Sequence, residues 1–395
     1  MHKLKLAIDG NEANVTNRVG SNVYAFEVLK QLYKLTADKK KFTCTILLAR
    51  PAVSDLPKAR NNWHYQIIKP SRFWTQWALP LHLFWQQKNY DLLFTPSHYA
   101  PRLSPIPYVS SVMDLAFLQF PDQFTKHDLF QLKHWTRYSV KRAQKIITIS
   151  QFSKQAIHDV YQKPLTEIVV APPAVGSFPS YLPLRWKAFL RKHKIEKNNY
   201  FLYLGTLQPR KNLLTLVESF EAFYRSQAAS QLKKKTACST PANLPQLVIA
   251  GKIGWLAEEL QARIKQSALQ EQIILTGFVS EELKKPLYEN AISTVLIGLY
   301  EGFGIPPLES LSVGTLPIVS SATSLPEVVG DAGLIVDPLD QTAISQALEK
   351  AWCIPPSKRQ QLVYKMKKQA DKFSWKKTGK IILKTIQDAA EHDAN

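Results

Sequence analysis

The segment LYEGFGIPPLESL, residues 299–311, is the stretch that decides how this chain folds. It follows the apolar run Ser293–Ile297, which reads as a buried strand. Gly302 and Gly304 then indicate a tight turn. Proline is favoured in the first turn of a helix, where its missing N–H has no partner to lose, so a helix is expected to begin near Pro306. The segment therefore predicts a strand, a glycine turn and a helix in succession.

Two carboxylates, Glu301 and Glu309, flank this turn. A helix N-terminus offers N–H groups and a positive dipole end, which suit phosphate. Glycines let the backbone approach a ligand closely, and carboxylates accept hydrogen bonds from hydroxyls. Together these parts predict a ligand with hydroxyls at one end and phosphates in the middle, which describes a nucleotide sugar. The structural alternative is that both carboxylates only complement the helix dipole.

A second segment, GTLQPRKN at residues 205–212, follows the apolar run Tyr200–Leu204. Arg210 grips phosphate with a planar fork, and Lys211 supplies a compact positive charge. Cations are unfavourable at the start of a helix, so this pair indicates an anionic ligand beyond the strand end.

The rest of the chain alternates short apolar runs with helical patterns, which predicts an α/β fold of two doubly wound, Rossmann-like domains facing a central cleft. The expected domains are residues 1–176, a linker at 177–195, residues 196–372, and a C-terminal helix at 373–395. The expected strands are residues 4–8, 43–48, 65–68, 92–95, 108–112, 146–149, 168–170, 200–204, 247–250, 273–275, 293–297, 318–320 and 334–336.

Composition narrows the class of protein. The 395 residues are 45% hydrophobic and 21% charged, as in ordinary globular proteins. No run approaches the ~18 apolar residues of a membrane span, and the first residues carry no secretory signal. The three cysteines, Cys44, Cys238 and Cys353, form neither a disulfide framework nor a metal motif. A cytoplasmic protein is expected.

The net charge and the absence of a metal-binding motif indicate which partners the protein can bind. The net charge of +20, from 51 basic and 31 acidic residues, favours anionic partners such as phosphorylated ligands, an anionic membrane or nucleic acid. The chain contains no Asp-x-Asp and no His or carboxylate cluster with metal spacing. We therefore expect no metal, so that protein cations and a helix dipole neutralise a departing diphosphate.

Two further segments stand out. The run RFWTQWALPLHLFW, residues 72–85, places aromatic side chains at helical spacing. It predicts an amphipathic core helix, with a helix facing a membrane or an acceptor as the alternative. Residues 227–245 are polar, with a lysine run and two prolines, and predict a solvated insertion. Ser324 and Glu327 have the spacing of a capping box.

The chain resembles the retaining glycosyltransferases of family 4, the glycosyl transferases group 1, which have the GT-B fold. The resemblance covers nearly the whole chain, and it implies that the C-terminal helix at 373–395 crosses back to the first domain. It is strongest over Gly205–Asn212, Gly251–Trp255, Gly277–Val279 and Tyr300–Asp340, the last containing the Glu-x7-Glu pair of the family. It implies a hexosyltransferase that moves a sugar from a nucleotide-diphosphate sugar to a cell-envelope or lipid-linked glycan, without metal or other cofactor.

The resemblance also implies roles for individual residues. Arg210 and Lys211 bind the donor diphosphate, Glu309 holds the ribose hydroxyls, and Glu301 contacts the transferred sugar. The first domain binds the acceptor and the second the nucleotide sugar. The implied donor-binding residues are Gly20, Arg210, Lys211, Phe278, Val279, Glu301, Gly302, Phe303, Gly304, Ile305 and Glu309, and the implied catalytic residues are Glu301, Lys211, Arg210 and Asp114.

One position departs from the family pattern. Many relatives carry His-Asp after the strand equivalent to residues 108–112, whereas this chain has Met113 and Asp114. Methionine cannot accept a proton from a sugar hydroxyl. Three explanations stay open: Asp114 or a nearby histidine takes over, the histidine is dispensable, or activity is weakened. His98, after the run at residues 92–95, is a further candidate to line the cleft.

Two competing functions remain. One is a catalytically weakened GT-B protein that acts as a membrane- or nucleic-acid-binding module. The other is a GT-B enzyme of a different reaction, such as a nucleotide-sugar epimerase. The basic runs at residues 39–41, 191–194 and 233–235 are scattered and form no nucleic-acid motif. We therefore expect peripheral contact with an anionic membrane, at its inner face, and no specific nucleic acid.

Overall fold

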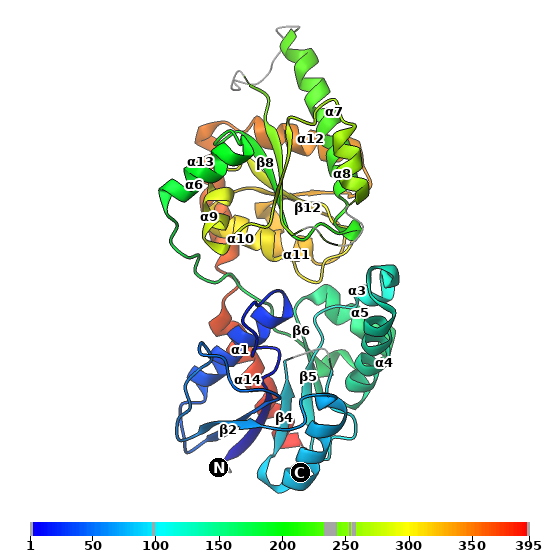
Figure 1. Ribbon diagram of the computed structural model, residues 1–395, viewed down its shortest axis with the longest axis vertical. Coiled ribbons are helices and arrows are strands. Elements are labelled where there is room, and N and C mark those ends of the chain that lie inside the picture. Colours follow the sequence, from blue (N-terminus) through cyan, green and yellow to red (C-terminus); the bar gives the residue numbers. More distant parts are fainter. Residues whose placement is uncertain (1–2, 97–98, 233–242, 253, 255–257, 393–395) are drawn as a thin grey trace. The chain divides into compact units, whose positions relative to one another are not determined.

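The computed structural model describes residues 3–96, 99–232, 243–252, 254 and 258–392, and the chain forms two compact units (Figure 1). Unit 1 comprises Met1–Pro173 and Phe373–Asn395, and unit 2 comprises Ala174–Lys372. His98, Cys238, Trp255 and residues 233–242 of the polar stretch lie outside the described residues.

Unit 1 is built on a seven-stranded parallel sheet with the order β3-β2-β1-β4-β5-β6-β7. Strands such as β4, with the sequence LLFT, are buried along their whole length, as a sheet covered on both faces requires. The strands are β1 (Leu4–Asp9), β2 (Phe42–Leu48), β3 (Trp63–Ile67), β4 (Leu92–Thr95), β5 (Tyr108–Ser111), β6 (Lys145–Thr148) and β7 (Ile168–Val170).

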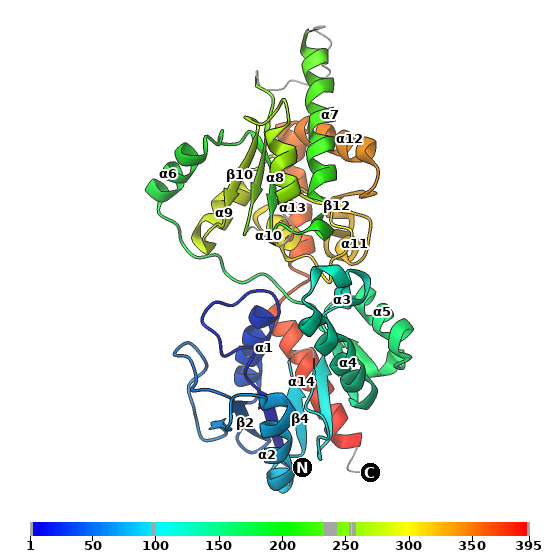
Figure 2. The same ribbon diagram turned by 45° about the vertical axis from the view of Figure 1, so that its right-hand side comes forward.

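Helices surround this sheet, as Figures 1 and 2 show. The longer ones bury one apolar stripe each; α1, for example, buries Tyr24, Ala25, Val28, Leu29 and Leu32. The helical segments of unit 1 are α1 (Ser21–Leu35), η1 (Trp74–Ala78), α2 (Leu79–Gln86), η2 (Gln87–Asn89), α3 (Ala116–Gln119), η3 (Pro121–Gln123), α4 (Lys126–Arg142), α5 (Gln151–Tyr161), η4 (Leu165–Glu167) and α14 (Trp375–His392).

The last helix, α14, returns to unit 1 and packs against α1. The rings of Trp375 and Tyr24 meet edge to face at 5.8 Å. Gly379 allows a close approach, because a Cβ atom there would lie 2.4 Å from Cβ of Gln31. The C-terminal helix therefore belongs to the first unit, as the resemblance implies. Among the described residues, no helix has both the length and the apolar character needed to cross a membrane.

Unit 2 is built on a six-stranded parallel sheet with the order β10-β9-β8-β11-β12-β13. Its strands are β8 (Tyr200–Leu204), β9 (Gln246–Ala250), β10 (Ile273–Gly277), β11 (Ser293–Leu296), β12 (Pro317–Ser320) and β13 (Leu334–Val336). Its helical segments are α6 (Pro183–His193), η5 (Pro209–Lys211), α7 (Leu213–Leu232), α8 (Glu258–Lys265), α9 (Glu281–Glu289), α10 (Ile305–Val313), α11 (Leu325–Val329), η6 (Gly330–Ala332), α12 (Gln341–Trp352) and α13 (Pro356–Ala370).

The stretch 177–195, expected as a linker, contains helix α6. Pro183 stands in its first turn, and Trp186 is buried in the core of unit 2 against residues such as Tyr200. The helix packs on this core through an apolar stripe. Basic residues interrupt the stripe in the sequence, so the segment was not predicted to be a helix. Residues 171–182, which precede this helix, lack regular secondary structure, and unit 2 begins at Ala174.

Each sheet has one point where the strand order reverses. In unit 1 it lies between β1 and β4, and in unit 2 between β8 and β11. Open α/β sheets bind ligands at the carboxyl ends of the strands at such a point. The segments that follow β8 and β11 carry the basic pair and the first glutamate of the sequence motifs, so both motifs meet at this edge.

Candidate active site

Hydrogen bonds to main-chain carbonyls join the turn after β8 to the turn after β11. The N–H of Leu299 donates to the carbonyl of Arg210 at 2.8 Å, and Nη1 of Arg210 donates to the carbonyl of Tyr300 at 3.2 Å. Asn212 adopts a left-handed φ of 58° and donates from Nδ2 to the carbonyl of Pro338 at 2.7 Å. These contacts fix the two motifs against one another.

An ion pair between Lys211 and Glu301 lies at the centre of this junction. Lys211 Nζ donates to Glu301 Oε1 at 2.5 Å, and the two side chains are only 13% and 10% exposed. Nearby, the buried hydroxyl of Tyr203 has a raised pKa because of burial, with the charge of Glu301 raising it further and that of Arg210 lowering it. One carboxylate and two cations thus share a largely water-excluded corner.

The main chain around Glu301 is held by two hydroxyl side chains. The N–H of Glu301 donates to Oγ1 of Thr323 at 3.1 Å. The hydroxyl of Ser324 donates to the carbonyls of Glu301 and Phe303 at 2.8 and 3.0 Å. Ser324 makes no side-chain capping bond to α11, so the expected capping box is wrong. The hydroxyl instead satisfies carbonyls of the glycine turn, a long-range contact that no local spacing encodes.

The glycine turn leads into α10 through Gly304, whose φ is 106°. A Cβ atom at Gly304 would lie 2.4 Å from Cδ2 of Leu325, so this position needs glycine. Ile305, Pro306 and Pro307 form the first turn. Since neither proline has an N–H group, Ile305 is the one residue of α10 before Leu308 that carries a main-chain donor. The helix start offers fewer donors to an anion than the sequence argument supposed.

Glu309 begins the second turn of α10 and is buried. Its Oε2 accepts a hydrogen bond from the hydroxyl of Tyr288 at 2.7 Å. Burial raises the pKa of Glu309, and the charge of Lys284 lowers it in part. Oε1 has no hydrogen-bond partner among the residues that the structure describes. One oxygen is therefore held in place by protein, and the other can accept a bond from a ligand hydroxyl.

Phe278 and Val279 follow β10 but differ in environment. The ring of Phe278 is 75% exposed, so a flat base can stack on it. The side chain of Val279 is buried in the core of unit 2, so only its main chain can face a ligand. The pair does not form one apolar surface for a nucleobase.

Gly20, Met113 and Asp114 belong to unit 1, whereas the other predicted site residues belong to unit 2. Gly20 precedes α1 with a φ of 52°. Met113 is buried, and Oδ1 of Asp114 accepts a hydrogen bond from the N–H of Ala116 at 2.9 Å. Asp114 thus stabilises the turn that starts α3.

Asp9 is a candidate functional residue that was not predicted from the sequence. It is the buried last residue of β1, at the point where the strand order of unit 1 reverses. Its Oδ1 accepts bonds from the N–H and from Nδ2 of Asn11, both at 3.0 Å. Burial raises the pKa of Asp9 to about 7, and the charge of Glu12 adds to the increase. The available signal was a carboxylate at the end of the apolar run LKLAID. Tyr288, the partner of Glu309, carried no such signal.

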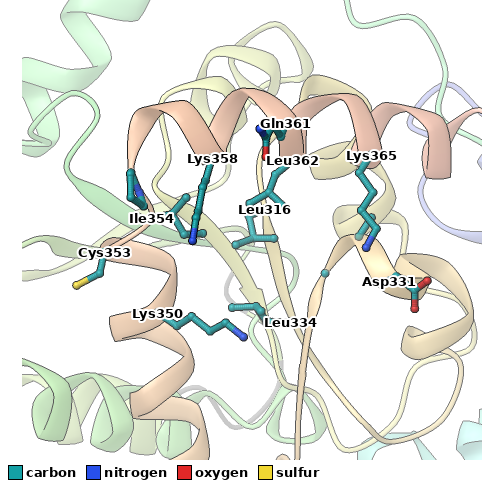
Figure 3. A pocket seen from close by; sticks show the side chains of 13 residues that line it. Leu316, Asp331, Leu334, Lys350, Cys353, Ile354, Lys358, Gln361, Leu362 and Lys365 are labelled. Carbon is teal, nitrogen blue, oxygen red and sulfur yellow. The ribbon is translucent and has the colours of Figure 1, made fainter.

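Unit 2 also contains a cavity of about 660 Å³ between α12 and α13 (Figure 3). Lys350, Lys358 and Lys365 line it together with apolar side chains such as Leu316 and Leu334. Leu316 precedes β12 and Leu334 begins β13, so the cavity lies at the amino ends of the strands. The candidate active site lies at the carboxyl ends of the strands, on the opposite edge of the sheet. Within the described ranges, no group of three or more His, Cys, Asp or Glu residues could hold a metal ion.

Comparison with known proteins gives matches along most of the chain. Residues 185–369 match the family model of the glycosyl transferases group 1. The chain is 30% identical over 315 residues to O-antigen chain mannosyltransferase B of Escherichia coli, covering 79% of this chain and 76% of that protein. It is 28% identical over 267 residues to O-antigen chain mannosyltransferase RfbU of Salmonella typhimurium, covering 68% and 66%. The solved structure of Anabaena Alr3699/HepE in complex with UDP and glucose aligns with a TM-score of 0.67 at 14% identity, over 97% of this chain and 99% of that chain.

Proposed function

Because the chain belongs to the glycosyl transferases group 1 and is a GT-B hexosyltransferase, we propose that it moves a hexose from a nucleotide-diphosphate sugar with retention of configuration. The observation that carries the proposal is the Lys211–Glu301 pair at the junction of the turns after β8 and β11. It brings phosphate-binding cations and a hydroxyl-binding carboxylate to one edge of the sheet.

The donor spans this edge. Arg210 and Lys211 bind its diphosphate, and Oε1 of Glu309 accepts a bond from a ribose hydroxyl. Glu301, with the main chain of Gly302–Gly304 and Ile305, contacts the transferred sugar. The ring of Phe278 stacks on the base, beside the main chain of Val279. Gly20 contacts the donor phosphate from the first domain, which binds the acceptor.

The transfer step needs positive charge beside the leaving group, because negative charge develops on the diphosphate. The acceptor oxygen forms a bond to C1 of the sugar while the bond from C1 to the phosphate oxygen breaks. The electron pair goes to the diphosphate, and a phosphate oxygen on the same face takes the acceptor proton. Arg210 and Lys211 stabilise the charge that develops on the diphosphate, so we propose that no metal takes part. With Met113 in place of a histidine, Asp114 is the proposed contact to the reacting sugars.

Mannose is the first candidate for the hexose, since both bacterial relatives named above are mannosyltransferases. Their products also suggest the acceptor, because both are described as acting on O-antigen chains. We propose a cell-envelope glycan carried on a lipid, extended at the inner face of the membrane. The UDP and glucose bound to the Anabaena protein support a nucleotide-diphosphate sugar as the donor class.

The test is donor binding and donor hydrolysis with a panel of nucleotide sugars in EDTA. The variants are Glu309→Gln and Lys211→Met, with Lys358→Met as a matched control. Lys358 is also a lysine of unit 2, but it lines the cavity at the amino ends of the strands. The proposal expects one donor to bind without metal, both site variants to lose it, and the control to keep it.

Two results would contradict parts of this proposal. Turnover that requires a divalent cation would overturn the metal-free mechanism. If no nucleotide sugar binds the parent protein, the chain is better explained as a weakened GT-B protein that acts as a binding module.

A further inference from the structure

The segment formed by η1 and α2, residues 74–86, belongs to unit 1, and α2 is labelled in Figure 2. Its side chains form two apolar sides. One side is buried in the core of unit 1 and consists of Trp74, Ala78, Leu79 and Leu83. The amphipathic core helix that the sequence predicts is thus present. The sequence pattern was compatible with either a core helix or a helix that exposes apolar side chains. The segment has both features.

The opposite side carries large apolar side chains that unit 1 leaves exposed. Trp77 is 66% exposed and Trp85 is 78% exposed. With Phe73, Leu81 and Phe84 they form what we call the aromatic face. The spacing of residues 77, 81, 84 and 85 matches one stripe of a helix. Isolated exposed apolar residues are common, but five of them within residues 73–85 mark an interaction surface.

Basic residues border the aromatic face. The exposed Arg72 lies at one end, with its guanidinium 5.1 Å from the centre of the Phe73 ring, and the exposed Lys88 lies at the other. Acidic residues are also rare in the surrounding sequence. From Leu56 to Met113 the one carboxylate is Asp91, against Lys58, Arg60, Lys69, Arg72, Lys88 and Arg102. Asp91 is itself engaged, since it accepts a bond from the N–H of Lys5 at 2.7 Å.

We infer that the aromatic face inserts into the surface of an anionic lipid bilayer. Tryptophan combines an apolar ring with a polar N–H and concentrates at the boundary between head groups and acyl chains. An amphipathic helix with such residues on one face and cations at its ends lies in the plane of that boundary. Arg72 and Lys88 then face lipid phosphates.

Two other occupants fit less well. A second copy of the chain would bring the same basic border against itself, in a protein that already carries a charge of +20. A nucleic acid would meet the cations, but it would leave Leu81 and most of the aromatic surface without an apolar partner. A bilayer satisfies both the apolar stripe and its charged border.

This inference rests on the proposed function only in taking the acceptor to be carried on a lipid. Insertion of the aromatic face would confine the enzyme to the surface on which that acceptor diffuses. Loss of insertion should then raise the KM for an acceptor held in vesicles. It should leave the affinity for the soluble nucleotide sugar unchanged, because the donor residues lie in unit 2.

The test is co-sedimentation of the full chain with vesicles of phosphatidylcholine alone and of phosphatidylcholine with phosphatidylglycerol. The variant is Trp77→Gln/Trp85→Gln, which changes exposed positions only. The control is Leu182→Gln/Leu184→Gln, which removes two exposed apolar side chains of unit 2. We expect the parent and the control to bind the anionic vesicles. We expect the tryptophan variant to bind at least about tenfold more weakly, since two aromatic rings no longer leave water.

Brominated lipids give a direct readout of insertion, because they quench tryptophan only at close range. Quenching should be present in the parent and largely lost in the tryptophan variant. Vesicle binding that is equal in the two proteins would overturn the inference. So would a concentration-dependent dimer that the variant abolishes, because the face would then bind a second copy. Retention on nucleic acid that depends on Trp77 and Trp85 would overturn it as well.

Donor binding, measured on the same samples, separates this inference from the proposed function. A parent that binds vesicles through the aromatic face but binds no nucleotide sugar contradicts the proposed function alone. A parent that binds the donor but not the vesicles contradicts the membrane inference alone.

Discussion

The two units carry an acidic side chain at the same point of the same kind of sheet, but they stabilise it differently. In unit 2, Glu301 follows β11 and pairs with Lys211, which lies 90 positions earlier in the chain. In unit 1, Asp9 ends β1 and is satisfied by Asn11, two positions later. Among the described residues, the carboxylate of Glu301 pairs with a cation, whereas the hydrogen bonds to Asp9 come from amide groups of Asn11.

This difference explains why one half of the protein is easier to interpret than the other. A long-range ion pair needs both turns in fixed positions, so the edge of unit 2 is a rigid site with two sequence motifs. In unit 1 the hydrogen bonds to Asp9 are local, but the N–H of Ala49 donates to Oδ1 of Asn11 at 2.8 Å and so ties this turn to the end of β2. Rigid elements support a site more accurately than loops do.

The largest expected effect comes from disturbing the main chain of unit 2. Gly251 has a φ of 149°, and a Cβ atom there would lie 1.8 Å from the carbonyl oxygen of Gly205. Gly251→Ala should therefore destabilise unit 2 by about 3–5 kcal/mol, through both backbone strain and overlap. Hydrogen exchange measured by mass spectrometry should show faster exchange in peptides of unit 2 and unchanged exchange in peptides of unit 1.

The matched control is Gly176→Ala, because no heavy atom lies within 4 Å of a Cβ atom at Gly176. It should leave exchange unchanged in both units. If Gly251→Ala were as stable as this control, the close contact between the turns after β8 and β9 would not be required.

The second expected effect is on catalysis. Glu301→Gln keeps the shape of the side chain but removes the negative charge that faces Lys211. The change should lower kcat/KM about 10²–10³-fold, a loss typical of removing one charged contact to a reacting group. Steady-state kinetics with the donor found in the panel would measure it.

Glu349→Gln, at an exposed position of α12, serves as the control for the loss of one negative charge. It should leave kcat/KM unchanged. A Glu301→Gln enzyme with nearly full activity would mean that the ion pair only holds the two turns together.

The third expected effect is a dependence of the stability of unit 1 on pH, which arises from the buried carboxyl group of Asp9. The pKa of Asp9 is raised by burial from 3.8 to about 7, so the folded state favours the protonated form. The stability that this group contributes is present at low pH and is lost as the pH rises through 7. Between pH 4 and pH 7 the free energy of unfolding should fall by about 3 kcal/mol on this account. Asp9→Asn keeps an oxygen for both bonds from Asn11 and should remove that pH dependence.

The measurement is the difference between parent and variant in the exchange rates of unit 1 peptides across this pH range. The difference cancels the titration of other groups. Parallel pH profiles of parent and variant would show that Asp9 titrates as an ordinary exposed carboxyl.

The fold could be predicted almost completely from the sequence. All thirteen expected strands are present, because strands buried on both faces read as continuous apolar runs. Helix α6 was missed, since Trp186 and its apolar neighbours stand among basic residues that resemble a solvated linker. The strand boundaries differ from the predicted ones by at most two residues.

The candidate site was predictable where its residues lie next to glycine and proline signals, as Glu301 and Glu309 do. Its supporting contacts were not. Tyr288 and Ser324 reach the site through pairings of 21 and 23 positions, and a single sequence does not reveal such pairings. The same limit applies to the prolines of α10, whose missing donors matter only once the helix start is known.

The smallest expected effect comes from substituting Asp114, the carboxylate of unit 1 that is proposed to contact the reacting sugars. Its Oδ1 caps the turn before α3, and asparagine can accept the same bond from Ala116. Asp114→Asn should therefore keep the stability of unit 1, whereas Asp114→Ala should lose about 1 kcal/mol. If Asp114 also contacts the reacting sugars, as proposed, both variants should lower kcat/KM, by about tenfold for asparagine. Full activity of Asp114→Asn would instead make Asp114 a turn-stabilising residue. The one carboxylate proposed for catalysis in unit 1 would then act only locally, as Asp9 does.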